Sequence, residues 1–311
     1  MTGFHRYLVE EIATDHADGL ISRREALRRL SLLGMALPAA GALLSACGAG
    51  RESAAASGTT SPAAASGTPP GTVTGGVPPP GPSPLPTEEI IFPGPEEGVT
   101  LQGAWVAASN PRGAVLVIHE NRGLNDHIRS VAGRLAADGY SALALDLLSR
   151  EGGTGSFGDT AKVTAALGGI PQERFAADMK TALGELERRV PGAKLGAVGF
   201  CFGGGMTWLL VASDEPRLAA AVPFYGPLPD GADFSGSEAA VLGVYAERDD
   251  RVNATRDEAR AALERAGLEY EIVTFPGADH AFFNDTGPRY DAGAAAQAYR
   301  RVIDWFGRHL S

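Results

Sequence analysis

Short apolar runs alternate with amphipathic stretches from about Glu88 to Ser311. One amphipathic stretch places Phe175, Met179, Ala182 and Leu186 on a single helical face, and residues 254–265 and 292–306 carry similar stripes. This alternation predicts one α/β domain, a mainly parallel sheet with helices on both faces. The expected strands cover residues 99–106, 114–119, 141–146, 194–199, 218–224, 240–246 and 269–275.

The first 87 residues have a different pattern. Residues 48–87 are almost entirely Ala, Ser, Gly, Thr and Pro, and cannot bury enough apolar surface to offset the entropy of ordering. They are expected to form a disordered tether between an export signal (residues 1–47) and the α/β domain (residues 88–311).

Residues 22–28, Ser-Arg-Arg-Glu-Ala-Leu-Arg, resemble a twin-arginine signal, with Ala26 where a larger apolar residue is usual. An uncharged apolar run follows and ends in Leu44-Ser45-Ala46-Cys47, which resembles a bacterial lipobox. The resemblance implies lipidation of Cys47 and an exported protein, held on a membrane by its N-terminus and facing the extracytoplasmic side. The alternative is that the run is a transmembrane anchor.

Composition and charge limit the classes of function that the chain can have. The 311 residues are 44% hydrophobic and carry a net charge of −10, so the chain can bury a substantial core but offers no attraction to nucleic acid. Of the two cysteines, Cys47 is assigned to the lipid, which leaves Cys201 without a disulfide partner. An unpaired thiol in an oxidising compartment indicates a chemical role.

Cys201 follows an apolar run and stands in Gly199-Phe200-Cys201-Phe202-Gly203. A strand that turns at once into a helix forces the turning residue to positive φ, which is tolerated when the residues two before and two after lack bulk. The thiol would then lie at a helix N-terminus that favours a thiolate and an oxyanion. Neither a phosphate-binding loop nor a dinucleotide fingerprint fits this spacing. A buried structural cysteine remains the alternative.

A base and an acid follow in chain order. His280 lies in a turn-rich loop before the final expected helix, whereas His5 and His16 precede the expected cleavage site and His309 lies at the C-terminus. A surface loop histidine is the alternative. Asp249 and Asp250 follow the strand at residues 240–246 and are the candidates to orient the imidazole; Asp279 is too near His280 in sequence to do so easily. The order nucleophile, acid, base is that of the α/β-hydrolases.

The segments around Glu120, Cys201, Asp249 and His280 resemble the dienelactone hydrolase family of α/β-hydrolases. The most specific pieces are G-F-C-F-G-G and P-G-A-D-H-A-F, and H-E-N-R-G-L at residues 119–124 completes the match. The resemblance covers nearly all of the chain from Glu88 onward. It implies an α/β-hydrolase fold and places Asp249, rather than Asp250, at the acid position.

The same resemblance implies that Glu120 holds or accepts the thiol proton in the resting state and would raise the pKa of the thiol. A salt bridge from Glu120 to Arg122 or Arg129 is the alternative. The main-chain amides of Phe202 and Asn121 are expected to hold the oxyanion. No metal or organic cofactor is expected, and residues 119–123 do not form a zinc motif.

The expected activity is hydrolysis of a small ester or lactone. Family members that act on dienelactones bind a carboxylate with arginines, and Asn284 stands where one of these is expected. Arg122, Arg150 and Arg174 are the candidates for the second, so a neutral or differently charged ester is at least as good a candidate substrate. A thiol peptidase or acyltransferase with the same triad, or a non-catalytic surface-anchored binding module, are the alternatives. The sequence predicts no oligomeric state.

Overall fold

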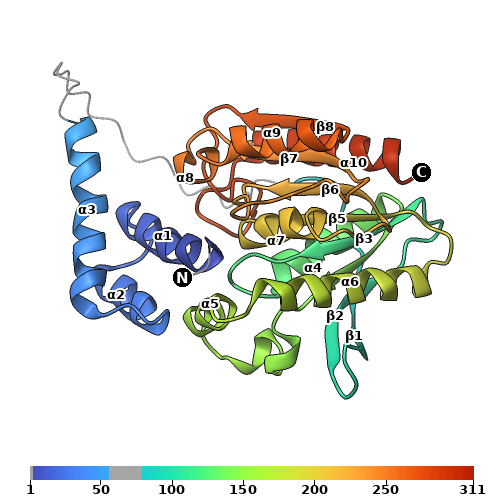
Figure 1. The fold of residues 1–311 in the computed structure, drawn as a ribbon, viewed down its shortest axis with the longest axis horizontal. Helices are drawn as coiled ribbons and strands as arrows, with labels where there is room; N and C mark the ends of the chain where they lie inside the picture. The colour runs from blue at the N-terminus through green and yellow to red at the C-terminus, as the bar shows by residue number, and fades with distance from the viewer. Residues whose placement is uncertain (1–2, 56–78) are drawn as a thin grey trace, which may run out of the picture. The chain divides into compact units, whose positions relative to one another are not determined.

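A computed structural model describes residues 3–55 and 79–311 of the chain (Figure 1). The chain divides into two compact units. One contains Met1–Leu8 together with Pro79–Ser311, and the other contains Val9–Pro78.

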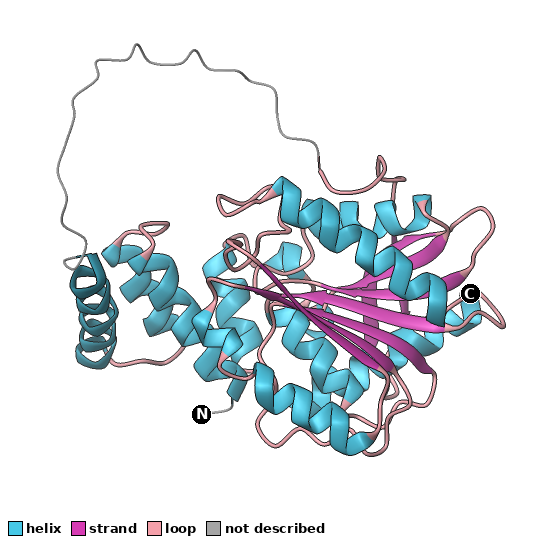
Figure 2. Cartoon of the chain, turned by 90° about the horizontal axis from the view of Figure 1, so that it is seen from above, coloured by secondary structure: helices cyan, strands magenta, loops and turns pink. Residues whose placement is uncertain are grey.

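An eight-stranded sheet forms the centre of the larger unit, in the order β1-β2-β4-β3-β5-β6-β7-β8. β1 and β2 are antiparallel to each other and β2 is antiparallel to β4, whereas every pairing from β4 to β8 is parallel. Helices lie on both sides of the sheet (Figure 2), which confirms the predicted α/β architecture. The strands are β1 (Glu88–Pro93), β2 (Thr100–Val106), β3 (Gly113–Ile118), β4 (Tyr140–Leu145), β5 (Leu195–Phe200), β6 (Leu218–Phe224), β7 (Ala240–Ala246) and β8 (Tyr270–Phe275).

The predicted strand ranges for β6 and β7 are confirmed at both ends, and those for β2, β3, β4, β5 and β8 are within one residue at each end. Every residue of β3, β4, β5 and β7 is buried, because helices cover both of their faces. β1 was not predicted. It is an edge strand in which Ile91 is 72% exposed, so its sequence lacks the continuous apolar run of the central strands.

The helices of the larger unit pack on this sheet and on one another. α6 lies beside α7, and α10 is joined to the end of α4 by a hydrogen bond from the Tyr299 hydroxyl to Asp138 Oδ2 (2.7 Å). The three helices predicted from apolar stripes correspond to α6, α9 and α10. The helices are α4 (Asp126–Ala137), α5 (Thr160–Gly168), α6 (Gln172–Arg189), α7 (Phe202–Val211), α8 (Asp250–Asn253), α9 (Arg256–Ala266) and α10 (Ala292–His309), with short 3-10 turns η1 (Ser149–Glu151) and η2 (Thr154–Ser156).

The N-terminal part of the chain is helical, with α1 (Gly3–Ala17), α2 (Arg23–Leu32) and α3 (Leu37–Ala55). The expected tether differs from the structure at both ends: α3 continues past Gly48, and residues 79–87 belong to the larger unit. Within this segment, the amide of Leu85 donates a hydrogen bond to the carbonyl of Gly133 (3.1 Å). Residues 56–78 of the expected tether, and the side chain of Cys47, lie outside the described residues.

The uncharged apolar run at residues 30–46 is divided between two helices, because the chain leaves the helical conformation between Leu32 and Leu37. Among the helices of the described residues, none combines the length and the hydropathy that crossing a bilayer requires.

Candidate active site

Cys201 forms the turn between β5 and α7, with φ 57° and ψ −117°. This positive φ confirms the predicted strained turn, a conformation that residues with a Cβ rarely adopt. The two flanking glycines make the turn possible. A side chain on Gly199 would overlap the Gly203 carbonyl, and one on Gly203 would overlap the Ile118 carbonyl. The thiol therefore belongs to the N-cap residue of α7, at the helix end whose first amides have no intrahelical partner.

His280 lies in the loop between β8 and α10, and Asp249 lies in the loop after β7. The imidazole Nδ1 is 2.5 Å from Asp249 Oδ2, and both side chains are buried. The second carboxylate oxygen of Asp249 accepts a hydrogen bond from the amide of Val252 (3.3 Å), which fixes the carboxylate at the start of α8. Its neighbour Asp250 is exposed in the first turn of that helix.

The thiol and the imidazole are close. Cys201 Sγ lies within 4.8 Å of a ring nitrogen of His280, although Cys201 is only 3% exposed. Because Nδ1 faces Asp249, the nitrogen available to the thiol side is Nε2. Asp279, by contrast, is directed to the exposed guanidinium of Arg248, at 3.7 Å. The geometry thus brings together Cys201, His280 and Asp249 from three separate loops.

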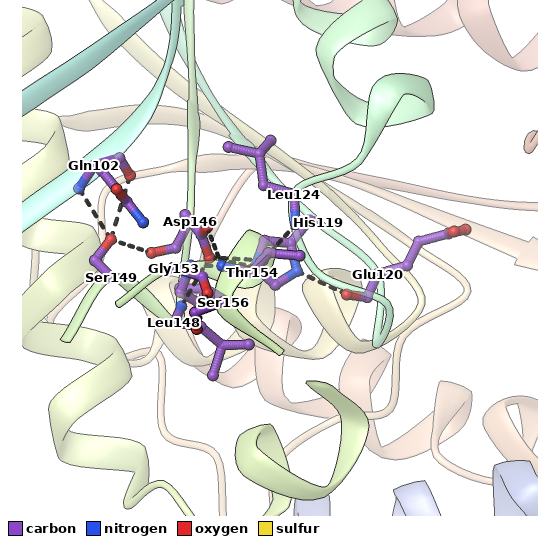
Figure 3. Close-up of polar contacts among 11 residues, drawn as sticks. Gln102, His119, Glu120, Leu124, Asp146, Leu148, Ser149, Gly153, Thr154 and Ser156 are labelled. Carbon is purple, nitrogen blue, oxygen red and sulfur yellow. Dashed lines mark hydrogen bonds and ion pairs between the residues drawn. The ribbon is translucent and has the colours of Figure 1, made fainter. Parts of the chain in front are cut away.

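The loop after β3 carries Glu120 and Asn121, and His119 fixes its main chain. The His119 Nε2 accepts a hydrogen bond from Leu147 N (3.1 Å), so the ring proton is on Nδ1, which donates to the Glu120 carbonyl (2.7 Å; Figure 3). Complete burial lowers the pKa of His119, which keeps the ring neutral and this arrangement intact. In a trans peptide the next amide, that of Asn121, points opposite to the Glu120 carbonyl.

Asp146 anchors the loop that follows β4 against the same region. Its carboxylate accepts hydrogen bonds from Leu148 N (3.0 Å) and from both the amide (2.7 Å) and the hydroxyl (2.9 Å) of Thr154. Thr154 Oγ1 in turn accepts from Leu124 N (3.0 Å), which connects the two loops. Figure 3 shows the Glu120 carboxylate pointing away from this cluster.

The Glu120 carboxylate is buried and hydrogen-bonded to Asn284. Asn284 Nδ2 donates to Glu120 Oε2 (2.7 Å), and its Oδ1 accepts from both the amide and the hydroxyl of Thr286, which fixes the orientation of the amide group. Glu120 Oε1 is buried with no hydrogen-bond partner among the described residues. The alternative salt bridge is not formed there: Arg129 binds Glu89 (2.9 Å), and Arg122 is exposed.

The remaining candidate arginines have acidic partners. Arg150 is bound by Asp178 (2.5 Å) and Glu96 (2.7 Å), and Arg174 is bound by Glu151. Of the three arginines proposed for substrate binding, Arg122 is therefore the one with no ion-pair partner among the described residues.

The loop that holds His280 and Asn284 is tied to α4 through Asp285. The Asp285 carboxylate is 2.7 Å from His127 Nδ1 and 2.5 Å from Arg134 Nη2. Burial alone would raise the pKa of Asp285, but the hydrogen bond with His127 and the positive charge of Arg134 lower it below its ordinary value. The carboxylate is therefore charged at neutral pH and holds the loop in place.

Tyr225 is a site residue that the sequence analysis did not identify. It directly follows β6, has φ 33°, and packs its ring against His280 with a centroid distance of 5.1 Å. Burial, together with the negative charges of Glu120 and of a Cys201 thiolate, raises the pKa of Tyr225 well above its ordinary value, so the phenol is neutral. Its position after a parallel strand is the one sequence signal that could have indicated it.

A mainly parallel sheet of this strand order, with Cys201 in a sharp turn after β5 and with Asp249 and His280 in the loops after β7 and β8, has the architecture of an α/β-hydrolase. The comparisons with known proteins are more specific. The model of the dienelactone hydrolase family matches residues 101–310, and the chain belongs to this family. It is a hydrolase acting on lactones or esters.

Relatives agree with this assignment. The chain is 32% identical over 215 residues to the Escherichia coli K12 protein named "Putative carboxymethylenebutenolidase", covering 65% of this chain and 79% of that one. A Saccharolobus solfataricus protein of the same name is 30% identical over 247 residues, covering 68% of this chain and 95% of that one. A Klebsiella pneumoniae structure named "Putative Dienelactone Hydrolase" is 29% identical, covers 72% of this chain and 100% of that one, and has a TM-score of 0.64.

Proposed function

We propose that this hydrolase cleaves carboxylic esters or lactones through a Cys201–His280–Asp249 triad and a covalent thioester intermediate. The observation that carries the proposal is the imidazole of His280, which is bonded to Asp249 through Nδ1 and turns Nε2 toward the thiol. A histidine held in this way can accept the thiol proton while the carboxylate stabilises the imidazolium that forms.

In the acylation step the thiol proton passes to His280 Nε2 and the sulfur forms a bond to the acyl carbon, whose carbonyl oxygen becomes an oxyanion. The amide of Phe202, at the first turn of α7, and the amide of Asn121 are proposed to bind that oxyanion. The tetrahedral intermediate then collapses, the bond to the leaving oxygen breaks, and the imidazolium gives its proton to that oxygen. Water activated by His280 hydrolyses the thioester in the second half of the reaction and restores the thiol.

We propose that Glu120 acts in the resting enzyme, before substrate binds. Its Oε1 is buried without a hydrogen-bond partner among the described residues, and the negative charges of Glu120 and of a Cys201 thiolate both act on the neighbouring Tyr225 phenol. A buried carboxylate oxygen that lacks a donor costs free energy, so a proton shared with the thiol or a donor on the substrate would relieve it. This supports a role in holding the thiol proton until substrate binds.

The substrate is proposed to be a neutral ester or lactone, because two of the three arginines considered for binding a carboxylate already have acidic partners. Asn284 contributes an amide that is already donated to Glu120, and Arg150 and Arg174 are held in ion pairs. We expect kcat/KM for a neutral aryl ester to equal or exceed that for an anionic dienelactone of similar size. Steady-state kinetics with both substrates check this, and a preference of about tenfold or more for the anion, equal to about 1.4 kcal/mol, would refute it.

We also infer that the chain is exported and anchored by a lipid on Cys47, on the basis of the lipobox at residues 44–47. Cleavage before Cys47 would release the first 46 residues from the mature protein. Mass spectrometry of the purified protein is expected to find a diacylglyceryl-modified Cys47 as the new N-terminus. An intact Met1 end on protein from the native host would show that the segment is retained.

A further inference from the structure

The first described residues, Gly3–Leu8 at the start of α1, belong to the same compact unit as the sheet, and Tyr7 contacts Cys201 and His280. Tyr7 is 3% exposed. Its hydroxyl oxygen lies 3.1 Å from Cys201 Sγ and 3.5 Å from His280 Nε2. The proposed mechanism does not use this tyrosine, yet its phenol touches both groups that perform the chemistry.

Other contacts hold this segment at the site. The guanidinium of Arg251, on α8, lies over the Tyr7 ring at 4.5 Å, and its Nη1 donates a hydrogen bond to the Tyr7 carbonyl (3.3 Å). Phe4 packs edge-on against Phe202 with a centroid distance of 5.9 Å. It also lies against Gly205 so closely that a side chain there would strike the Phe4 ring. The Tyr7 ring is thus packed by Arg251, and the Phe4 ring by Phe202 and Gly205.

The Tyr7 hydroxyl oxygen lies close to both groups that an ester's leaving oxygen must approach. In the acylation step the leaving oxygen of an ester must lie near the sulfur that attacks its acyl carbon and within reach of the imidazolium that protonates it. The Tyr7 oxygen satisfies both conditions. It therefore occupies the place of a phenol that has just been released from an aryl ester.

We propose that Gly3–Leu8 is an internal ligand of the active site, with the Tyr7 phenol bound in the leaving-group subsite. This inference rests on the proposed function, since it interprets the same site. The subsite accepts an aryl alcohol. Its ring would lie under the Arg251 guanidinium, as the Tyr7 ring does. Because the segment is part of the same chain, its binding is intramolecular, so it competes with substrate in the unprocessed protein. Cleavage before Cys47, inferred above, removes the segment and opens the site.

The test uses the full chain with Cys47→Ser, which leaves Cys201 as its one thiol. Tyr7→Ala is compared with this parent, with Tyr7→Phe, and with the matched control Arg6→Ala, which removes only an exposed ion pair to Asp230 from the same segment. Two quantities are measured for each: the rate of iodoacetamide alkylation of Cys201, and KM and kcat for 4-nitrophenyl acetate. Circular dichroism checks that each variant is folded.

Tyr7→Ala is expected to alkylate at least about tenfold faster and to show a KM lowered by a similar factor with little change in kcat, as a competing internal ligand requires. Tyr7→Phe, which keeps the ring, should lie between Tyr7→Ala and the parent, and Arg6→Ala should match the parent. Added phenol is expected to slow alkylation of Tyr7→Ala, where the subsite is open, and to leave the parent unaffected.

If folded Tyr7→Ala has the same alkylation rate and the same KM as the parent, the inference is wrong. If the same samples still hydrolyse the ester through Cys201, the proposed function stands. Conversely, faster alkylation that phenol suppresses, with no ester hydrolysis by any variant, supports the internal ligand and contradicts the proposed function. The two failures are therefore distinguishable.

Discussion

Replacement of Cys201 with alanine is expected to lower kcat for ester hydrolysis by about 10⁶-fold, which is the scale of loss when the nucleophile of a triad is removed. The physical reason is that water, a much weaker nucleophile than a thiolate, would have to attack the ester directly. His280 would still be hydrogen-bonded to Asp249, and the amides of Phe202 and Asn121, proposed to bind the oxyanion, would be unchanged, but no thioester could form. Steady-state and single-turnover assays with 4-nitrophenyl acetate measure the loss.

The small size of alanine makes this a clean test. Cys201 stands at φ 57° between two glycines, and a smaller side chain adds no strain to that turn. The melting temperature is therefore expected to change little, which separates a chemical effect from an effect on folding. Hydrolysis by Cys201→Ala within about tenfold of the parent rate would rule out a cysteine nucleophile.

Replacement of Asp249 with asparagine is expected to lower kcat by roughly 10⁴-fold with the fold retained. The carboxylate accepts a hydrogen bond from His280 Nδ1–H, whereas an asparagine amide can donate to that nitrogen and stabilise the opposite tautomer. Nε2 would then carry the proton and could not accept one from the thiol. The bond from Val252 N is kept, since the asparagine oxygen can still accept it.

The matched control is Asp250→Asn, which changes the adjacent, exposed carboxylate in the first turn of α8. Its kcat is expected to equal that of the parent. Equal losses in the two variants, or a larger loss in Asp250→Asn, would contradict the assignment of Asp249 as the residue that orients His280. Stopped-flow assays from pH 6 to 9 show whether the loss follows from the protonation state of the imidazole.

The central strands were predictable because they are buried on both faces. A strand such as β5 or β7 has no exposed position, so its sequence is a continuous apolar run that ends where the polar loop residues begin. The edge strand β1 was missed because its partners lie on one side only and Ile91 faces solvent. Helix α4 was also not predicted. Its apolar face is interrupted by His127 and Arg134, which are buried through their contacts with Asp285.

For the site, local sequence indicated Cys201 because the glycines of the turn are adjacent in the chain. It indicated His280, and either Asp249 or Asp250, because these residues follow strands, and only the family resemblance selected Asp249. The contact between Asn284 and Glu120 joins segments 164 residues apart and depends on how two loops pack, which no local pattern encodes. The approach of Tyr7 to Cys201 spans 194 residues and starts from a segment whose sequence indicated only export. These contacts between distant segments became visible only in the folded structure.

The central claim is a covalent acyl group on Cys201, and the most direct measurement is trapping of that group. The enzyme is mixed with a slowly hydrolysed aryl ester, quenched with acid within milliseconds, and analysed by intact-protein and peptide mass spectrometry. The account predicts one acyl group per chain, on the peptide that contains Cys201, with kinetics that match the burst of released phenol. Burst release of phenol with no acyl group on Cys201, or with the acyl group on another residue, would contradict it.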